Sequence, residues 1–211
     1  IRYIFQNKKF DNLIFMDGDG EDRPIEIKNM VEKIIENPSK SVVAKRVKRS
    51  EGLFFQFLYQ IHKLITLFFT GKNINFGNYC MLIKDDVEKL HSKASLWSSF
   101  SGSVKKHINS FNEINSIRGL RYYGPSQMPL IKLLIHSLSI IAVFKYQVFL
   151  RSTLIIIALA YLNPFFANFS IILQILIVIF NMMIFIVSKR ELKKDLINSH
   201  TNLGEINRIT H

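Results

Sequence analysis

The chain lacks the residues that build disulfide frameworks and cysteine-rich metal sites. Its 211 residues include one cysteine, Cys80, so an internal disulfide and a zinc-finger type of site are both excluded. A reduced, cytoplasmic setting is therefore the default expectation. The chain also lacks internal repeats and low-complexity tracts. Its length suits one compact domain of ordinary size plus an appendage.

Acidic residues are fewer than basic ones, and the sequence contains no motif of a nucleic-acid-binding domain to explain the excess of positive charge. The 28 Lys and Arg residues against 16 Asp and Glu give a net charge of +12, which predicts an anionic partner. The chain also has 18 Phe residues and a mean hydropathy of +0.16. That pairing is more typical of a protein seated on an acidic membrane surface, and we expect no nucleic acid partner.

Charged residues are absent from residues 152–188, a run of 37 positions. One helix of this length would extend about 55 Å, nearly twice the hydrocarbon core of about 30 Å. We therefore expect two spans, near residues 146–161 and 171–187. The break is expected at Asn163-Pro164, because proline disfavours a continuing helix and polar residues suit a turn.

Basic residues flank this run, whereas the expected turn carries no charge. Lys145 precedes the run, and four basic residues follow it: Lys189, Arg190, Lys193 and Lys194. By the positive-inside rule, both ends of a transmembrane hairpin are expected in the cytoplasm, with the protein in the cell membrane as a multi-pass protein. Both spans are short, so we expect Arg151 to extend its guanidinium toward the lipid headgroups.

Two further stretches have the pattern of helices at a membrane surface. Residues 53–69 carry apolar residues at helical spacing, among them Phe57, Ile61, Leu64 and Phe68. This helix either packs on the core of its own domain or lies in the membrane interface, and the pattern leaves both open. Residues 128–144 are more uniformly apolar and predict a second interfacial helix that leads into the spans.

The N-terminal part has the signals of a mixed sheet domain. Residues 12–16 form a short apolar run that ends in Asp17-Gly18-Asp19-Gly20, which predicts a buried strand and a tight loop. Pro24 opens a helical stretch through about Glu36, and residues 41–45 predict another strand. Strands that alternate with helices indicate an α/β fold.

The acidic loop is the segment with the most evident chemistry. Asp17 and Asp19 stand two residues apart, followed by Glu21 and Asp22. Carboxylate oxygens at this spacing suit Mg²⁺ or Mn²⁺, and such an ion can bridge the phosphates of a nucleotide. Taken alone, the pattern is better explained by a solvated acidic turn, and the residues after it do not continue an EF-hand.

Four segments occur in an informative order. They are residues 13–24 around the Asp-x-Asp loop, 42–49 with its basic end, 70–82, and 118–128, which begins Arg118-Gly119-Leu120-Arg121. Together they resemble dolichyl-phosphate mannose synthase and the bacterial polyprenyl-phosphate glycosyltransferases of family 2. The resemblance extends to about Arg151. It implies a GT-A type fold and transfer of a sugar from a nucleotide-sugar donor to a polyprenyl-phosphate lipid.

The resemblance also implies a metal-assisted reaction and a catalytic set. Asp17 and Asp19 would hold Mg²⁺ or Mn²⁺, with Glu21 as a third ligand, and Asp22 and Arg46 would complete the set. A divalent ion and arginines stabilise the charge that develops on a departing nucleotide diphosphate. Because a lipid phosphate is already anionic, this acceptor needs no general base.

The remaining basic residues receive substrate-binding roles from the same resemblance. Arg46 and Arg49 would bind the lipid phosphate, although Arg49 could equally face solvent. Arg118 and Arg121 would clamp the donor diphosphate, with Ser126 donating a hydrogen bond. The competing interpretation of Arg118 is a juxtamembrane charge attracted to acidic lipid.

Two features depart from the family pattern. Gln127 stands where the family usually has Lys, which removes one cationic contact from this segment. In the family, the first strand and the nucleotide-base pocket precede the Asp-x-Asp loop by several dozen residues. The chain opens Ile1-Arg2-Tyr3, so we expect an N-terminally truncated sequence whose own activity depends on that missing part.

The expected organisation has four parts. A partial GT-A catalytic domain covers residues 1–120, a juxtamembrane interfacial helix 121–145, the hairpin 146–188 and a cytoplasmic tail 189–211. Two other functions stay open. One is a glycosyltransferase acting on a lipid or glycan hydroxyl, with Asp22 or Glu51 as its base, and the other is a non-catalytic membrane scaffold. A homo-oligomer is also left open.

Overall fold

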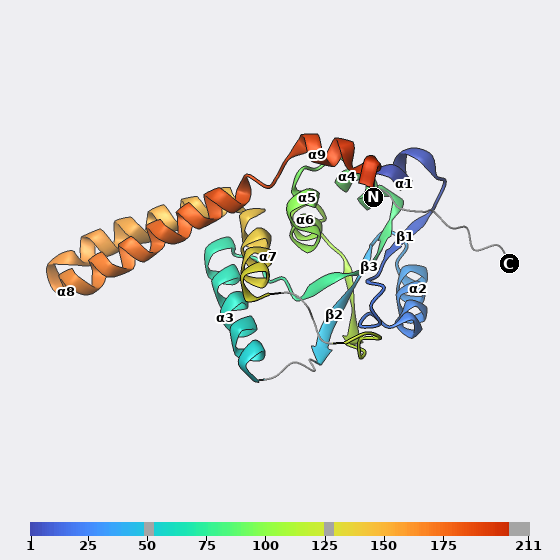
Figure 1. The fold of residues 1–211 in the computed structure, drawn as a ribbon, viewed down its shortest axis with the longest axis horizontal. Coiled ribbons are helices and arrows are strands. Elements are labelled where there is room, and N and C mark those ends of the chain that lie inside the picture. The colour runs from blue at the N-terminus through green and yellow to red at the C-terminus, as the bar shows by residue number, and fades with distance from the viewer. Residues whose placement is uncertain (49–52, 125–128, 203–211) are drawn as a thin grey trace.

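The computed structural model describes residues 1–48, 53–124 and 129–202, which form a mixed α/β body and a long projecting helix (Figure 1). Within these residues, four strands form one sheet in the order β1-β3-β2-β4. They are β1 (Asn12–Phe15), β2 (Val42–Lys48), β3 (Phe76–Ile83) and β4 (Asn112–Ile117). β1 and β2 run antiparallel to β3, and β4 runs parallel to β2. The carboxyl ends of β1, β2 and β4 therefore meet at one edge.

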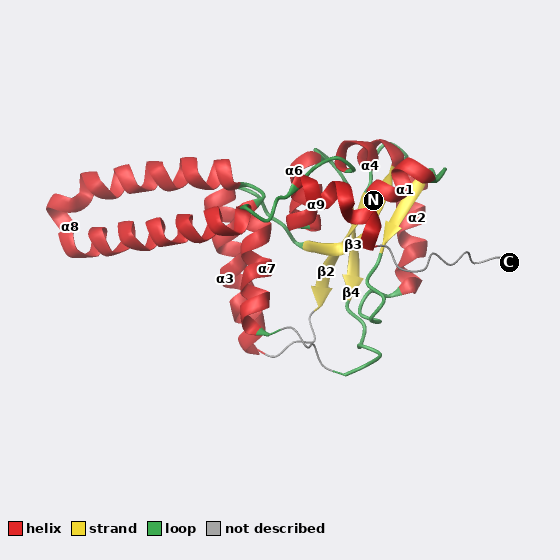
Figure 2. Ribbon diagram, turned by 45° about the horizontal axis from the view of Figure 1, so that its top comes forward, coloured by secondary structure: helices red, strands yellow, loops and turns green. Residues whose placement is uncertain are grey.

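The helices of the body and the C-terminal region are α1 (Arg2–Asn7), the 3₁₀ turn η1 (Pro24–Glu26), α2 (Ile27–Glu36), α3 (Leu53–Thr70), α4 (Lys84–Leu90), α5 (Ser95–Ser98), α6 (Phe100–His107), α7 (Leu130–Ala142), α8 (Lys145–Ser188), α9 (Lys193–Ile197) and the 3₁₀ turn η2 (Asn198–Asn202). α2 lies on one face of the sheet, and α4 and α6 lie on the other (Figures 1 and 2). The body therefore has three layers.

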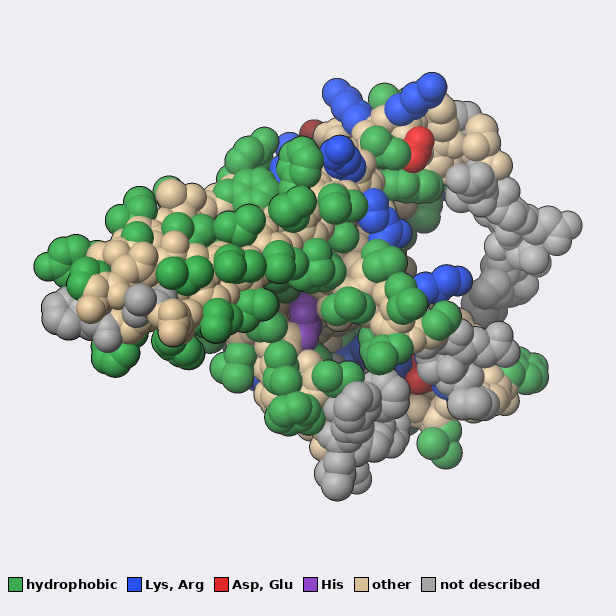
Figure 3. Space-filling model, turned by 60° about the vertical axis from the view of Figure 1, so that its left-hand side comes forward, with side chains coloured by type: hydrophobic (Ala, Val, Ile, Leu, Met, Phe, Trp, Pro, Cys, Tyr) green, Lys and Arg blue, Asp and Glu red, His purple; other side chains and the backbone are tan. Residues whose placement is uncertain are grey.

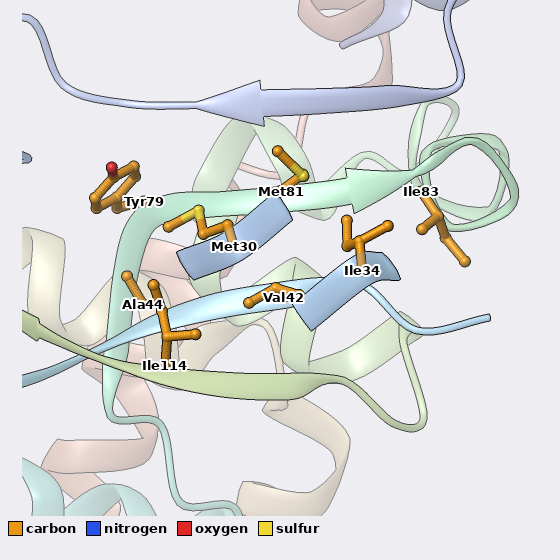
Figure 4. Close-up of a cluster of buried hydrophobic side chains, with 8 residues drawn as sticks. All are labelled: Met30, Ile34, Val42, Ala44, Tyr79, Met81, Ile83 and Ile114. Atoms are coloured by element: carbon orange, nitrogen blue, oxygen red, sulfur yellow. The ribbon is translucent and has the colours of Figure 1, made fainter. Parts of the chain in front are cut away.

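Alternation along the strands divides the core between the two faces of the sheet. On the α2 side, eight buried residues pack together: Met30, Ile34, Val42, Ala44, Tyr79, Met81, Ile83 and Ile114 (Figure 4). On the opposite side, Val43, Cys80 and Leu82 pack with residues of α4 and α6. Val42 on the α2 side and Cys80 on the opposite side are both fully buried, so the sheet centre is closed to water on both faces.

α3 and α7 lie side by side across the base of α8, away from the sheet (Figures 1 and 2). Ile65 and Phe69 of α3 pack against the buried cluster that α7 and α8 form, which includes Ile141 and Ile184. The guanidinium of Arg151 in α8 also donates a hydrogen bond to the carbonyl of Phe68 at 2.9 Å. α3 is thus anchored to the start of the projecting helix.

α3 and α7 also expose apolar side chains that no other described element covers. On α3 these are Phe57, Ile61, Leu64, Leu67 and Phe68, and on α7 they are Leu130, Ile131, Leu134 and Ile135. Figure 3 shows hydrophobic side chains spread over the projecting helix and continuing onto the body beside it. An apolar surface of this extent is typical of a protein or membrane contact.

α8 runs outward and returns, so that its two arms lie next to each other (Figure 2). Phe166 at the turn has a non-helical backbone, with φ −143° and ψ 48°. Across the arms, the hydroxyl of Ser170 donates to the carbonyl of Leu159 at 2.6 Å, and the amide of Gln174 donates to Asn163 at 3.2 Å. The first candidate span ends at Pro164, and the non-helical residue Phe166 follows the expected break at Asn163-Pro164 by two positions.

Both arms are long and apolar enough to cross a membrane. The two candidate spans are Lys145–Pro164, with 20 residues, and Asn168–Ile197, with 30. Only 11% and 22% of their most apolar windows are buried inside the protein, so these arms are not core helices of the body. This agrees with the predicted spans 146–161 and 171–187, and the helices extend beyond them.

The strands and helices that we expect near the N-terminus are present in the structure. The predicted strand 12–16 corresponds to β1, the helix from Pro24 to Glu36 to η1 and α2, and the strand 41–45 to β2. The predicted helices 53–69 and 128–144 correspond to α3 and α7. β3 and β4 are not predicted as strands, although β3 lies at the centre of the sheet.

A matched pair of substitutions in α2 tests the position of the core. The side chain of Ile34 packs against the sheet and is 8% exposed, whereas that of its neighbour Ile35 is 72% exposed. We expect Ile34→Ala to lower the free energy of unfolding by about 2–5 kcal/mol, because it removes buried methylenes and leaves a cavity. Ile35→Ala should change it little. Thermal melting in detergent measures both, and equal losses would contradict this packing.

Candidate functional site

The candidate site occupies the edge of the sheet where the parallel strands end. The acidic loop, residues 16–23, follows β1, Arg46 lies near the end of β2, and the segment 118–124 follows β4. The antiparallel β3 brings its first residues, including Asn78, to the same edge. Side chains that are far apart in sequence therefore converge because their strands share one direction. Ligands of open α/β sheets bind at such carboxyl edges.

Hydrogen bonds between residues close in sequence hold the acidic loop in a compact turn. The backbone N–H of Asp17 donates to the Asp22 carboxylate at 2.9 Å, and the N–H of Glu21 donates to the Asp19 carboxylate at 3.0 Å. The amide of Asn78 donates to the Asp17 carboxylate at 3.3 Å, which connects the loop to β3. The loop therefore presents the carboxylates of Asp17 and Asp19 in a fixed arrangement.

Two arginines of the segment 118–124 hold Glu21. Nη2 of Arg118 contacts Oε2 of Glu21, and Nε of Arg121 donates to Oε1 at 2.8 Å. Arg121 also lies 3.4 Å from the Asp19 carboxylate. The side chains of Glu21 and Arg118 are only 12% and 14% exposed. An ion pair that water barely reaches is screened little by salt, so it fixes the two segments to each other.

Backbone contacts reinforce this connection, which we call the arginine clamp: Glu21 with Arg118 and Arg121. The N–H of Gly119 donates to the carbonyl of Glu21 at 2.8 Å, and the N–H of Tyr122 donates to the carbonyl of Asp19 at 2.9 Å. A Cβ atom at position 119 would lie 2.5 Å from the carbonyl oxygen of Gly20. Only glycine allows the two loops to approach this closely.

Asp22 is the most buried carboxylate of the loop. It is 5% exposed, and its carboxylate lies 3.9 Å from Nη2 of Arg46. Burial raises the pKa of Asp22, and the negative charges of Asp17 and Asp19 act in the same direction. The hydrogen bond from the Asp17 backbone and the charge of Arg46 oppose this shift. Asp22 thus acts inside the loop as an acceptor for the backbone.

Tyr79 and Glu26 hydrogen-bond to the backbone at the end of the acidic loop and of β4. The hydroxyl of Tyr79 donates to the carbonyl of Arg23 at 2.7 Å, and the Glu26 carboxylate accepts from the N–H of Ile117 at 3.0 Å. Burial, then the charges of Glu26 and Asp22, raise the pKa of Tyr79 to about 12. Tyr79 therefore stays a protonated donor across the physiological pH range and supports the loop.

His136 lies in α7. Desolvation and then the charges of Arg190 and Arg46 lower its pKa, whereas the charge of Asp17 acts in the opposite direction.

Seven of the predicted site residues belong to this one constellation: Asp17, Asp19, Glu21, Asp22, Arg46, Arg118 and Arg121. The other two, Arg49 and Ser126, lie outside the described residues, as do Glu51 and Gln127. Among the residues that the structure describes, no group of three His, Cys, Asp or Glu side chains is arranged to hold a metal ion. The roles assigned to these residues stay predictions.

The assignment of Mg²⁺ or Mn²⁺ to Asp17 and Asp19 stays a prediction. Such ions take one or two protein carboxylates and complete their shell with water and phosphate oxygens. Glu21, the third predicted ligand, is held by the arginine clamp. A metal here would therefore depend on Asp17 and Asp19.

Sequence reasoning missed three residues of the site, which are Asn78, Tyr79 and Glu26. Asn78 and Tyr79 lie in one of the four segments, but no motif gives either a role. Glu26 sits in an ordinary helix start. Only the folded arrangement brings these three residues to the loop and to the end of β4.

Comparison with known proteins gives no relative, because no family model, no curated protein and no solved structure matches the chain. The chemistry of the site therefore rests on its own residues. An acidic loop next to three arginines is suited to bind a divalent ion together with an anionic group such as a diphosphate.

Asp22→Asn tests the burial of this carboxylate. Because its pKa is raised in the folded state, the contribution of Asp22 to stability is complete below its unfolded value near 3.8 and is lost as the pH rises through the folded pKa. The amide keeps an oxygen for the Asp17 N–H and carries no charge. We expect the melting temperature of the variant to rise relative to the parent between pH 4 and 7, by about 2–4 °C for each 1 kcal/mol.

Asp11→Asn makes the same substitution at an exposed residue before β1 and serves as the control, whose melting temperature should stay close to that of the parent. A difference between Asp22→Asn and the parent that stays flat or falls as the pH rises would contradict the burial of Asp22.

Glu21→Gln tests the arginine clamp. The variant loses two charge-assisted contacts, so the segment 118–124 should open more often. We expect trypsin to cleave after Arg118 and Arg121 about tenfold faster than in the parent, as followed by mass spectrometry. Glu36→Gln, which removes an exposed ion pair with Lys33, should leave these rates unchanged. Unchanged cleavage in Glu21→Gln would show that the clamp does not hold the segment.

Proposed function

We propose that this chain is the membrane-anchored part of a family 2 glycosyltransferase with a GT-A type catalytic domain. It would move a sugar from a nucleotide-sugar donor to a polyprenyl-phosphate lipid. One observation carries the proposal: an acidic Asp-x-Asp loop, Arg46 and the arginine clamp converge at one sheet edge, close to the helices that expose apolar surface. The order of the four segments supports the same assignment.

The metal has a defined part in this proposal. Mg²⁺ or Mn²⁺ bound at Asp17 and Asp19 would neutralise charge on the donor diphosphate as the sugar leaves. Arg121 lies 3.4 Å from the Asp19 carboxylate, so it is within reach of the same diphosphate oxygens. Arg118 is the second arginine beside them. Glu21 orients both guanidinium groups before the donor binds, which limits the reorganisation that binding requires.

The acceptor would approach from the side of α3 and α7. β2 leads from Arg46 toward α3, and the segment 118–124 leads toward α7. Both helices expose apolar residues, and they lie across the base of α8, which is the arrangement of interfacial helices around a span (Figure 2). A lipid phosphate at the headgroup level would then meet Arg46, and no general base is needed for its anionic oxygen.

α8 supports the proposed membrane placement. Its first candidate span, Lys145–Pro164, has 20 residues, which corresponds to about 30 Å of helix. The two arms would form a transmembrane hairpin whose turn lies on the far side. Lys145 is the first residue of the first arm, and Lys189 and Arg190 follow the end of α8, which favours a cytoplasmic body in the cell membrane.

Sugar transfer is the direct test of this function. The full-length protein, with any residues encoded before Ile1, is incubated in membranes with labelled sugar nucleotides and Mg²⁺ or Mn²⁺. We expect label in an organic-extractable lipid that mild acid cleaves. Asp17→Asn and Asp19→Asn should each lower the rate about a hundredfold, since each removes a carboxylate from the metal.

Asp85→Asn in α4 is the matched control, because Asp85 is exposed and lies outside the site. Label in an acid-stable glycan would favour the hydroxyl acceptor instead. Transfer that resists both loop substitutions would remove the metal-bound loop from the reaction. No transfer with any sugar nucleotide, while chelators leave binding to membranes intact, would favour the scaffold.

Cysteine labelling tests the topology of the arms. The native Cys80 is buried, and burial raises its pKa, so it should react poorly with maleimides. We expect Asn168→Cys near the turn to react with an impermeant maleimide in intact cells. Lys193→Cys, after the arms, should react only once the membrane is opened. Labelling of both positions in intact cells would contradict the hairpin.

A further inference from the structure

A polar pocket of about 280 Å³ lies between the end of α3 and the end of α6. Its polar lining comes from Lys72 and Asn73 in the loop after α3, and from Lys105, Lys106 and Asn109 around the end of α6. No carboxylate contributes to this lining within the described part of the chain. We call it the lysine pocket. None of its lining residues belongs to the acidic loop or the arginine clamp.

The lysine pocket lies at the base of α8. Gly71, which also lines it, has φ +70°, and a Cβ atom at this position would lie 2.5 Å from Nη2 of Arg151. Arg151 belongs to the first arm of α8 and donates to the carbonyl of Phe68 in α3. The pocket therefore sits where the proposed transmembrane arms leave the body, with Arg151 as a further cation nearby.

The three lysines differ in how strongly the fold engages them. Lys106 donates to the carbonyl of Val143 at 2.7 Å, so it helps to hold the end of α7. The Nζ atom of Lys105 lies 4.8 Å from the ring centroid of Phe111, and Lys72 is exposed. The negative charge of Glu191 acts on Lys106, but Glu191 is itself paired with Lys145 at 2.9 Å. The pocket therefore concentrates positive charge.

We propose that the lysine pocket binds an anionic phosphate group, such as the headgroup phosphate of an acidic lipid. Lysine ammonium groups are suited to phosphate, and the side-chain amides of Asn73 and Asn109 add neutral donors. Basic residues at the membrane surface bind acidic headgroups. The inference rests on the membrane placement of α8 within the proposed function, but it does not require sugar transfer.

Calorimetric titration of the purified full chain in a neutral detergent tests this proposal. The probes are short-chain phosphatidic acid, inorganic phosphate and short-chain phosphatidylcholine. We expect phosphatidic acid to bind and phosphatidylcholine, which has no net charge, to bind much more weakly. The double variant Lys72→Gln/Lys105→Gln should weaken phosphatidic acid binding about tenfold or more. Lys106 is left in place because the fold uses it.

The matched control is Lys28→Gln/Lys33→Gln in α2, which makes the same change of charge at exposed positions. It should bind as the parent does, and both variants should melt as the parent does. As a second measurement on the parent, rising salt should weaken the binding.

The outcomes separate the two sources of phosphate. Binding of phosphatidic acid but not of inorganic phosphate supports a lipid headgroup site, and equal binding of both supports a site for free phosphate. Absence of binding by either, or equal affinity of parent and Lys72→Gln/Lys105→Gln, overturns the proposal. A chain that binds phosphatidic acid here yet transfers no sugar would contradict the proposed function and leave this inference intact.

Discussion

The arginine clamp is the contact on which the arrangement of the candidate site depends. Glu21 belongs to the loop after β1, whereas Arg118 and Arg121 follow β4, and β1 and β4 are the two outermost strands of the sheet. The side chains of Glu21 and Arg118 are largely shielded from water, so a missing partner would leave a charge that is costly to bury. The clamp therefore fixes the acidic loop against the segment that leads toward α7.

The helices at the base of the arms are held together by separate contacts. α7 packs on α3 and α8, and Arg151 joins α8 to the end of α3. The lysine pocket lies at this base, between the ends of α3 and α6. The acidic loop and the arginine clamp lie instead at the carboxyl edge of the sheet.

Much of the fold could be predicted from local patterns, and the site could be predicted in part. The apolar run before Asp17 gives β1, and helical spacing gives α3 and α7. β3 could not be predicted in this way, because it begins Phe76-Gly77-Asn78, which is typical of a turn, and it is buried on both faces without alternation. β4 alternates but buries only Ile114 and Ser116, which is a weak signal.

The contacts of the site join residues that are far apart in the sequence. The sequence therefore indicated which residues belong to the site better than which partners they contact. Glu21 and Arg118 are 97 positions apart, and Asp17 and Asn78 are 61 apart. The Asp-x-Asp spacing indicates carboxylates suited to a metal, but nothing in it shows that Glu21 would pair with arginines. Strand direction decides these pairings, and it emerges only from the assembled sheet.

We propose that Asp17 and Asp19 together hold a divalent ion beside the arginine clamp. Crystals of the full-length protein, grown in lipid with Mn²⁺ and a nucleoside diphosphate, would locate the ion by its anomalous scattering. We expect one manganese peak within about 2.5 Å of a carboxylate oxygen from each aspartate, with the diphosphate next to Arg121. A manganese peak elsewhere, with Asp19 still paired to Arg121, would contradict it.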